Sequence, residues 1–325
     1  MIKITNNSER EFRLLNLTDP QLKIEEWDEN NQAGKIFKKT VETLIERVSP
    51  DLITLSGDLS YADDFESYKK FSDYFDSFKI PWSCCFGNHD NQDGDEAVQK
   101  IIDEYMKHEF FVFEKCDKSL GNSNVVILIE KNGKNAEAVI LMDTHDRVPY
   151  HKDDCGKNQA WGKLTPEQLS WYKDRVLELK EIGCNDTILI THIPINAYLS
   201  AANAAFKNPK EDKSVTLSDS YGSLIWNEGY EDSYGVLHEP ISAHPEDEGA
   251  FDLICQLGST KNIVCGHNHV NNWVVKYNGV RFIFATKTGC GSYWEPEING
   301  GTVLAINENG VVSTNHEYVD VSEFL

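Results

Sequence analysis

Five short apolar stretches run through the chain, and each ends in a turn rich in Gly, Asp, Asn or His. The stretches cover residues 13–17, 52–56, 82–86, 187–190 and 261–265. Apolar runs of this length, bounded by turn residues, predict buried β-strands. Because the carboxyl ends of neighbouring strands in an open α/β sheet converge on one crevice, we expect the polar residues after these strands to lie close together.

Helical periodicity fills the gaps between the first three stretches. Apolar side chains recur at helical spacing over residues 33–48 and 65–78, which predicts one amphipathic helix in each gap. Thr165-Pro166-Glu167-Gln168 has the composition of a further helix N-terminus, with Thr as the cap and Gln reaching back to it. Strands that alternate with helices predict a largely parallel sheet with right-handed crossovers.

Later apolar stretches are typical of hairpin strands and indicate a second, mixed sheet. They cover residues 125–130, 138–143, 281–285, 302–306 and 311–318. Two sheets with helices outside form a sandwich, so we predict an α/β fold with four layers, α/β/β/α, and two mixed β-sheets. The whole chain, residues 1–325, is expected to be one domain.

The turns after the five predicted strands carry carboxylates, amides and imidazoles. Taken singly, each is an ordinary turn or strand exit. Taken together they are candidate metal ligands, because carboxylate and amide oxygens mixed with imidazoles suit Fe, Mn or Zn. In chain order the side chains are Asp19, Asp58, Asn88, His89, Asp90, His192, His267 and His269.

The order of these residues resembles the calcineurin-like metallophosphoesterase superfamily. That family has an Asp block followed by Gly-Asp, Gly-Asn-His-Asp/Glu, a His and Gly-His-x-His. Here the last four blocks are Gly57-Asp58, Gly87-Asn88-His89-Asp90, His192 and Gly266-His267-Asn268-His269. The sequence around and after the last block is similar to the purple-acid-phosphatase-like branch of the superfamily.

The resemblance implies a centre of two metal ions, divalent or of mixed valence, that are Fe, Mn or Zn. Two such ions about 3.5–4 Å apart bind phosphate oxygens and acidify a water. Asp58 would bridge the ions. The other ligands divide between them, with Asp19 and His269 on the first ion and Asn88, His192 and His267 on the second. His89 would approach the leaving-group oxygen or the phosphate, and Asp90 would orient the His89 ring.

One position departs from the family pattern. The first block is most often Asp-x-His, whereas this chain has Asp19-Pro20-Gln21 and no imidazole there. Tyr61, three residues after Asp58, is similar to the Tyr whose phenolate binds ferric iron in purple acid phosphatases. The amide oxygen of Gln21 is the alternative ligand, and Tyr61 would then be an aromatic ring packed beneath the site.

Residues 196–245 show little periodicity and many turn and acidic residues, which indicates an insertion at the rim of the site. Its candidate substrate contacts are Tyr230, Tyr234 and His238. His145, just after the strand predicted to end at residue 143, is a further candidate. A solvated loop is an equally weighted interpretation of the insertion, because its acidic residues would repel a phosphate.

Composition narrows the class of protein. The chain has 325 residues, of which 40% are hydrophobic and 26% charged, as in a soluble enzyme with a sizeable core. The net charge of −22 disfavours nucleic acid as a partner. We expect a cytoplasmic protein without membrane association, because no apolar stretch approaches about 18 residues and the first residues lack a signal-peptide core. The eight cysteines include no Cys-x-x-Cys pair and are expected to be free thiols.

Hydrolysis of phosphate monoesters through metal-bound hydroxide is the function that the resemblance implies most directly, with a small phosphorylated molecule as substrate. A phosphodiesterase or nucleotide pyrophosphatase would use the same metals. An alternative of another class is a non-catalytic metal- or phosphate-binding module. A serine hydrolase is disfavoured because the chain has no Gly-x-Ser-x-Gly motif. The sequence does not indicate an oligomeric state.

Overall fold

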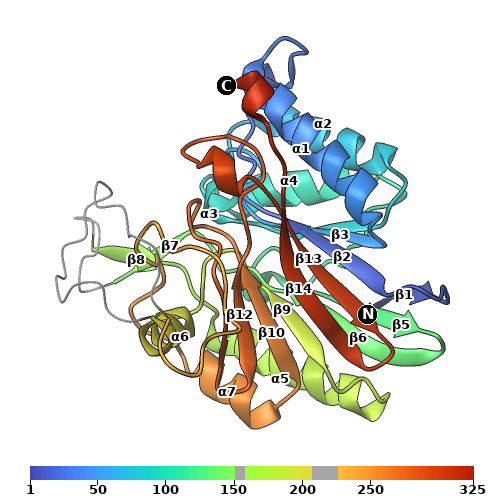
Figure 1. Ribbon diagram of the computed structural model, residues 1–325, viewed down its shortest axis with the longest axis vertical. Coiled ribbons are helices and arrows are strands. Elements are labelled where there is room, and N and C mark those ends of the chain that lie inside the picture. The colour runs from blue at the N-terminus through green and yellow to red at the C-terminus, as the bar shows by residue number, and fades with distance from the viewer. Residues whose placement is uncertain (151–157, 207–225) are drawn as a thin grey trace.

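The computed structural model describes residues 1–150, 158–206 and 226–325. Two β-sheets pack against each other, and helices cover their outer sides (Figure 1). The five-stranded sheet has the order β14 (Gly310–Tyr318), β13 (Gly300–Asn307), β2 (Phe12–Leu17), β3 (Leu52–Ser56), β4 (Trp82–Cys85). The seven-stranded sheet has the order β1 (Ile2–Asn6), β5 (Val125–Lys131), β6 (Lys134–Leu141), β9 (Thr187–Ile190), β10 (Thr260–Cys265), β12 (Val280–Phe284), β11 (Val274–Tyr277).

The five-stranded sheet begins as the sequence predicts. Strands β2, β3 and β4 are parallel, and helices α1 (Gln32–Val48) and α2 (Phe65–Ser77) connect them. The hairpin of β13 and β14 was expected in the second sheet, but β13 pairs antiparallel with β2. Both sheets therefore mix parallel and antiparallel strands.

The seven-stranded sheet carries the last two predicted strands of the site. Its central strands β6, β9, β10 and β12 are all parallel. Strand β5 runs antiparallel to β6 and parallel to β1, and β11 runs antiparallel to β12. The carboxyl ends of β9 and β10 therefore open at the same edge of the sheet.

The side chains of β5 alternate between the two faces of the seven-stranded sheet, and this alternation shows what covers each face. Val125, Ile127 and Ile129 belong to the hydrophobic cluster that the two sheets share, which also extends to α1, α2 and α4 (Asp95–Tyr105). Val126 and Leu128 point the other way, into the cluster formed with α5 (Pro166–Glu181), α6 (Ala197–Ala205) and α7 (Ala250–Leu257). Successive side chains of a strand face opposite sides, so this sheet is covered on both faces. The predicted four-layer sandwich is confirmed.

Two local predictions are also met. The backbone N–H of Gln168 donates to Thr165 Oγ1 at 3.2 Å, and the N–H of Thr165 donates to Gln168 Oε1 at 2.9 Å, which completes the capping box of α5. The cysteines in the described ranges are all free thiols, while Cys155 lies outside those ranges.

None of the helices in the described part of the chain combines the length and the apolar composition that a membrane span requires.

Candidate metal centre

The candidate ligands come from both sheets and meet where their strands end. Asp19 and Asp58 follow β2 and β3, and Asn88 begins the short helix α3 (Asn88–Asn91) after β4. His192 follows β9, and His267 and His269 follow β10. No more than 7% of the surface of any of these side chains is exposed. Five loops from two sheets therefore bring these six buried polar side chains to one edge of the sandwich.

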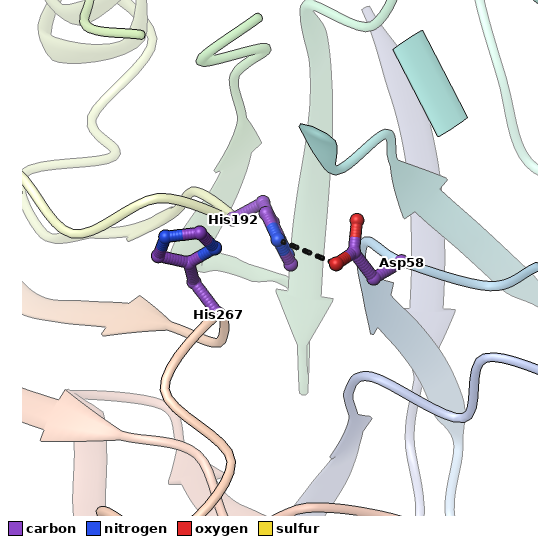
Figure 2. Close-up of side chains that lie close together, drawn as sticks. All are labelled: Asp58, His192 and His267. Carbon is purple, nitrogen blue, oxygen red and sulfur yellow. Dashed lines mark ion pairs between the residues drawn. The ribbon is translucent and has the colours of Figure 1, made fainter. Parts of the chain in front are cut away.

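Two overlapping groups of side chains lie close enough to hold metal ions. Asp58, His192 and His267 form one group and Asp19, Asp58 and His269 the other, with ligand atoms within 4.8 Å of one another in each. Figure 2 shows the first group, in which His192 Nε2 and Asp58 Oδ2 face each other at 3.3 Å. Because Asp58 belongs to both groups, it occupies the place of a bridging carboxylate.

Backbone carbonyls fix which imidazole nitrogen faces the centre. His192 Nδ1 lies 2.8 Å from the carbonyl oxygen of Ser56, and His269 Nδ1 lies 2.9 Å from that of Tyr293. A carbonyl only accepts, so Nδ1 carries the proton in both rings. Nε2 of His192 is left facing Asn88 Oδ1 at 3.1 Å, and Nε2 of His269 faces Asp19 Oδ1 at 3.3 Å. This orientation is typical of histidines that bind metal through Nε2.

The backbone at the centre is held in an uncommon conformation. Asp19, Asp58 and His267 have φ angles of 55°, 52° and 72°, in the left-handed region. Each such residue costs roughly 1–2 kcal/mol. Strain of this kind persists only where surrounding contacts impose it, and it is typical of functional sites.

Asp90 supplies some of those contacts. Its buried carboxylate accepts hydrogen bonds from the backbone N–H groups of Asp58 at 2.8 Å and Gly87 at 2.7 Å, and from the Tyr68 hydroxyl at 2.7 Å. Burial and the negative charge of Asp58 raise the pKa of Asp90 to about 6. Asp90 thus holds the turns after β3 and β4. The expectation that it orients the His89 ring is not met, because His89 Nδ1 lies 3.2 Å from Gln92 Oε1 instead.

Two glycines are required because side chains of the centre approach the backbone closely. A Cβ atom at Gly87 would lie 2.2 Å from Asp58 Oδ1, and one at Gly57 would lie 2.6 Å from His192 Nδ1. Gly57 also has a φ of 90°, which L-residues with a side chain rarely adopt. The motif glycines therefore make room for the ligands as well as for the turns.

The charges within the cluster are strongly coupled. Burial alone would lower the pKa of His192, but the carboxylates of Asp58 and Asp19 raise it to about 10. Burial and the positive charge of His192 lower the pKa of His267 to about 3. The pKa of Asp19 falls below its usual value, since the surrounding imidazoles and Lys287 outweigh the effect of burial. Buried carboxylates beside imidazoles are the donor set that a dication neutralises.

Three buried atoms at the centre have no hydrogen-bond partner among the described residues and fit a metal ion. They are Asp19 Oδ1, Gln21 Oε1 and His267 Nε2. The amide nitrogen of Gln21 donates to Asp58 Oδ2 at 3.1 Å, which leaves its oxygen as the unsatisfied end. Tyr61, the competing candidate, is partly exposed, and its ring packs edge-on against His89 at 5.1 Å between centroids. Burial and then the negative charge of Asp58 raise the pKa of Tyr61, which disfavours its phenolate form in the protein alone.

The four residues predicted to contact the substrate all have contacts within the protein. His145 Nε2 lies 3.2 Å from Gln168 Oε1, at the start of α5. The Tyr234 hydroxyl donates to the carbonyl oxygen of Thr314 at 2.7 Å, and His238 Nδ1 lies 2.7 Å from Glu295 Oε2. Tyr230 packs against the hydrophobic cluster on the outer face of the seven-stranded sheet. Of the predicted rim insertion, residues 207–225 lie outside the described residues.

Three asparagines, one within the motif of His267 and His269 and two just after it, fasten residues 236–242 to the centre. Asn268 Oδ1 accepts from the N–H of Ser242 at 3.1 Å, and Asn272 Oδ1 accepts from that of Val236 at 2.8 Å. Asn271 accepts from the N–H of His238 at 2.9 Å and donates to the carbonyl of Glu239 at 3.0 Å. The part of the predicted rim that the structure describes is therefore tied to the loop that carries His267 and His269.

Sequence analysis missed three side chains beside the ligands. The Tyr293 ring stacks on His269 at 4.2 Å between centroids, and Trp161 packs edge-on against His267 at 4.3 Å. Buried Lys287 donates through Nζ to the carbonyl oxygen of Asp19. Lys287 follows the apolar strand β12, but residues 285–288 contain none of the Gly, Asp, Asn or His residues by which the other turns were selected. Nothing local marks Trp161 or Tyr293, because their partners are distant in the sequence.

Comparison with known proteins gives a consistent result. A family model described as Calcineurin-like phosphoesterase matches residues 12–286. Two Arabidopsis thaliana proteins, named probable inactive purple acid phosphatase 29 and 14, are 22% identical over 275 residues and 25% identical over 269 residues. The alignments cover 76% and 75% of this chain but 62% and 60% of the relatives, so the chain spans about three fifths of their length. The predicted resemblance to purple acid phosphatases is thereby confirmed.

Solved structures support the same fold. A dimetal phosphatase from Danio rerio matches with a TM-score of 0.57, over 95% of this chain and 99% of that chain. The two sequences are 10% identical, so this likeness concerns the fold alone.

Proposed function

Because this chain belongs to the calcineurin-like phosphoesterase family, we propose that it is a metal-dependent hydrolase of phosphate monoesters. The observation that carries the proposal is the position of Asp58. One buried carboxylate lies within 4.8 Å of the ligand atoms of two separate groups, one with His192 and His267 and the other with Asp19 and His269. Such sharing is what a two-metal centre requires of its bridging ligand.

The proposed ligands follow from the atoms that face the centre. Asp58 would bridge the two ions. Asp19 and His269 would bind the first ion, and Asn88, His192 and His267 would bind the second. Gln21 completes the first site rather than Tyr61, because its amide oxygen is buried without a hydrogen bond within the described chain. A neutral amide in place of a phenolate favours divalent Mn, Zn or Fe over ferric iron.

Metal ions bound there supply positive charge for the phosphate oxygens and lower the pKa of a water. His89 is the proposed general acid, which protonates the leaving-group oxygen. Its backbone N–H donates to Asp58 Oδ1 at 2.8 Å, so its position is fixed relative to the bridging carboxylate. Its ring lies between Tyr61 and Gln92, and only part of it is buried. A partly exposed ring at this position can come within hydrogen-bond reach of a bound leaving group, as a general acid must.

The names of the plant relatives favour a second candidate, a non-catalytic module that binds metal or phosphate on the same scaffold. The full set of buried donors supports a working enzyme instead. A phosphodiesterase or nucleotide pyrophosphatase would use the same donors, and the leaving-group side of the site separates these activities.

The test compares the rates at which the protein hydrolyses p-nitrophenyl phosphate and bis(p-nitrophenyl) phosphate, after the protein is reconstituted with Mn, Zn or Fe(II). The proposal expects faster turnover of the monoester and loss of turnover in Asp58→Asn. Faster turnover of the diester would replace the monoesterase by a phosphodiesterase. Bound metal without hydrolysis of either compound would favour the binding module.

A further inference from the structure

A cation lies one aromatic ring away from a proposed metal ligand. The short strands β7 (Arg147–Pro149) and β8 (Gln159–Trp161) pair antiparallel, which places Arg147 opposite Trp161. Arg147 Cζ lies 3.7 Å from the centroid of the Trp161 ring. The same ring lies 4.3 Å from that of His267, at an angle of 81°. Arg147 lies over one ring, Trp161, and the edge-to-face contact of Trp161 with His267 places this pair beside the second proposed metal site.

The ribbon of β7 and β8 is packed tightly where it meets the centre. Gly162 directly follows Trp161, and its N–H donates to the carbonyl oxygen of Asp146 at 2.7 Å. A Cβ atom at Gly162 would lie 1.9 Å from the carbonyl oxygen of Thr144. Burial raises the pKa of Asp146, and the charges of Arg147, His89 and Asp58 also act on it. The base of the ribbon therefore borders the site.

A guanidinium that lies over an aromatic ring is suited to bind anions. Its planar fork of N–H donors matches a carboxylate or phosphate in a bidentate arrangement. Trp161 also restricts the long side chain before a ligand arrives, which lowers the entropic cost of binding. In a chain with a net charge of −22, an anionic substrate needs such a local cation.

We propose that Arg147 binds a second anionic group of the substrate, beside the phosphoryl group that is hydrolysed. The proposal rests on the proposed function, and it names the substrate class as small phosphorylated molecules that carry a further phosphate or carboxylate. The Trp161 ring contacts both Arg147 and His267, so one aromatic ring separates the proposed anion site from a proposed metal ligand.

Calorimetry on the metal-loaded protein tests the proposal without hydrolysis. It compares the affinity for inorganic phosphate, which has one phosphoryl group, with the affinity for pyrophosphate, which has two. In Arg147→Gln, the preference for pyrophosphate over phosphate should fall about tenfold, because a charge-assisted bidentate contact is lost. In Arg147→Lys, the preference for pyrophosphate should lie between those of the wild type and Arg147→Gln, since lysine keeps the charge but lacks the planar fork.

Lys163→Gln is the matched control. It removes one positive charge two residues after β8, where Lys163 Nζ pairs with Glu248 Oε1 at 2.7 Å, and it should keep the preference of the wild type for pyrophosphate. Metal content should stay at the wild-type value in all variants. An equal loss for both ligands in Arg147→Gln, or no loss, would overturn the proposal. If the protein hydrolyses no phosphate ester, the proposed function fails, and the calorimetric ratio still decides whether Arg147 binds the second anion.

Discussion

At the scale of single residues, His89 separates catalysis from metal binding. The His89 ring belongs to neither group of candidate ligands, although the residue directly follows Asn88 in the sequence. We expect His89→Ala to lower kcat by about 10²- to 10⁴-fold, as for the loss of a general acid. Metal content should remain that of the wild type. Gln92→Ala, which removes only the residue beside the His89 ring, should lower kcat less. Full activity in His89→Ala would remove this residue from the mechanism.

Glu137 on β6 is a buried carboxyl far from the metal centre. Its Oε2 accepts from the N–H of Val311 at 3.2 Å, and its Oε1 has no hydrogen-bond partner among the described residues. Burial, and then the negative charge of Asp186, raise the pKa of Glu137 well above its usual value. A raised folded-state pKa means that its contribution to stability is present below the unfolded pKa of about 4.3 and is lost as pH rises through the folded pKa.

Glu137→Gln should therefore be more stable than the wild type at pH 8, by about 1–2 kcal/mol, because a neutral amide replaces a buried charge. The advantage should shrink toward pH 5. Urea unfolding of the metal-free protein at both pH values measures it, with exposed Glu297→Gln as the control. A stability difference that does not change between the two pH values would contradict the assignment.

The sequence predicts the ligands better than it predicts what surrounds them. Asp19, Asp58 and His192 stand directly after apolar strands, which is a local signal. The groups that orient them are carbonyls, such as that of Ser56, or rings such as Tyr293, and their roles arise from contacts between distant segments. The partners of Tyr234 and His238, Thr314 and Glu295, could not be foreseen, because polarity in a loop does not reveal which way the loop turns.

At the scale of elements, the loop after β10 is tied to residues 236–242 by buried amides. Asn271 is fully buried and serves the N–H groups of His238 and Glu239, at 2.9 and 3.1 Å. We expect Asn271→Ala to lower the free energy of unfolding by roughly 2–3 kcal/mol, since these groups lose their partner. Cleavage by protease within 236–242 should also quicken.

Asn309→Ala is the control, because Asn309 is exposed in the turn between β13 and β14. It should change stability by less than about 0.5 kcal/mol. Equal effects of the two substitutions would show that Asn271 does not hold the segment.

Elements with a strong local signal were predicted well. Helices α1 and α2 follow their apolar periodicity, and α5 starts at its capping box. The hairpin of β13 and β14 was assigned to the wrong sheet, because periodicity indicates a strand but not its neighbour. Its pairing with β2 depends on which edge of the first sheet remains open after β2, β3 and β4 have paired.

At the scale of the whole molecule, metal binding should couple the two sheets. Asp19 and Asp58 belong to the five-stranded sheet, whereas His192, His267 and His269 follow strands of the seven-stranded sheet. A ligand present at 1,000 times its Kd stabilises the folded state by about 4 kcal/mol. Chelation should therefore lower Tm by roughly 5–10 °C. Asp58→Asn should show little of this shift, and an unchanged Tm after complete metal removal from the wild type would contradict the coupling.

Metal analysis with a visible absorption spectrum, on protein purified without chelators and then reconstituted, tests most directly whether Asp58 bridges two ions. We expect about two equivalents of divalent metal per chain in the wild type, and fewer than about one in Asp58→Asn, as for a two-metal site that loses its bridge. The wild type should be colourless, because Gln21 supplies an amide oxygen. A purple band that disappears in Tyr61→Phe would transfer that ligand position to Tyr61. Absence of bound metal after reconstitution would contradict the metal centre itself.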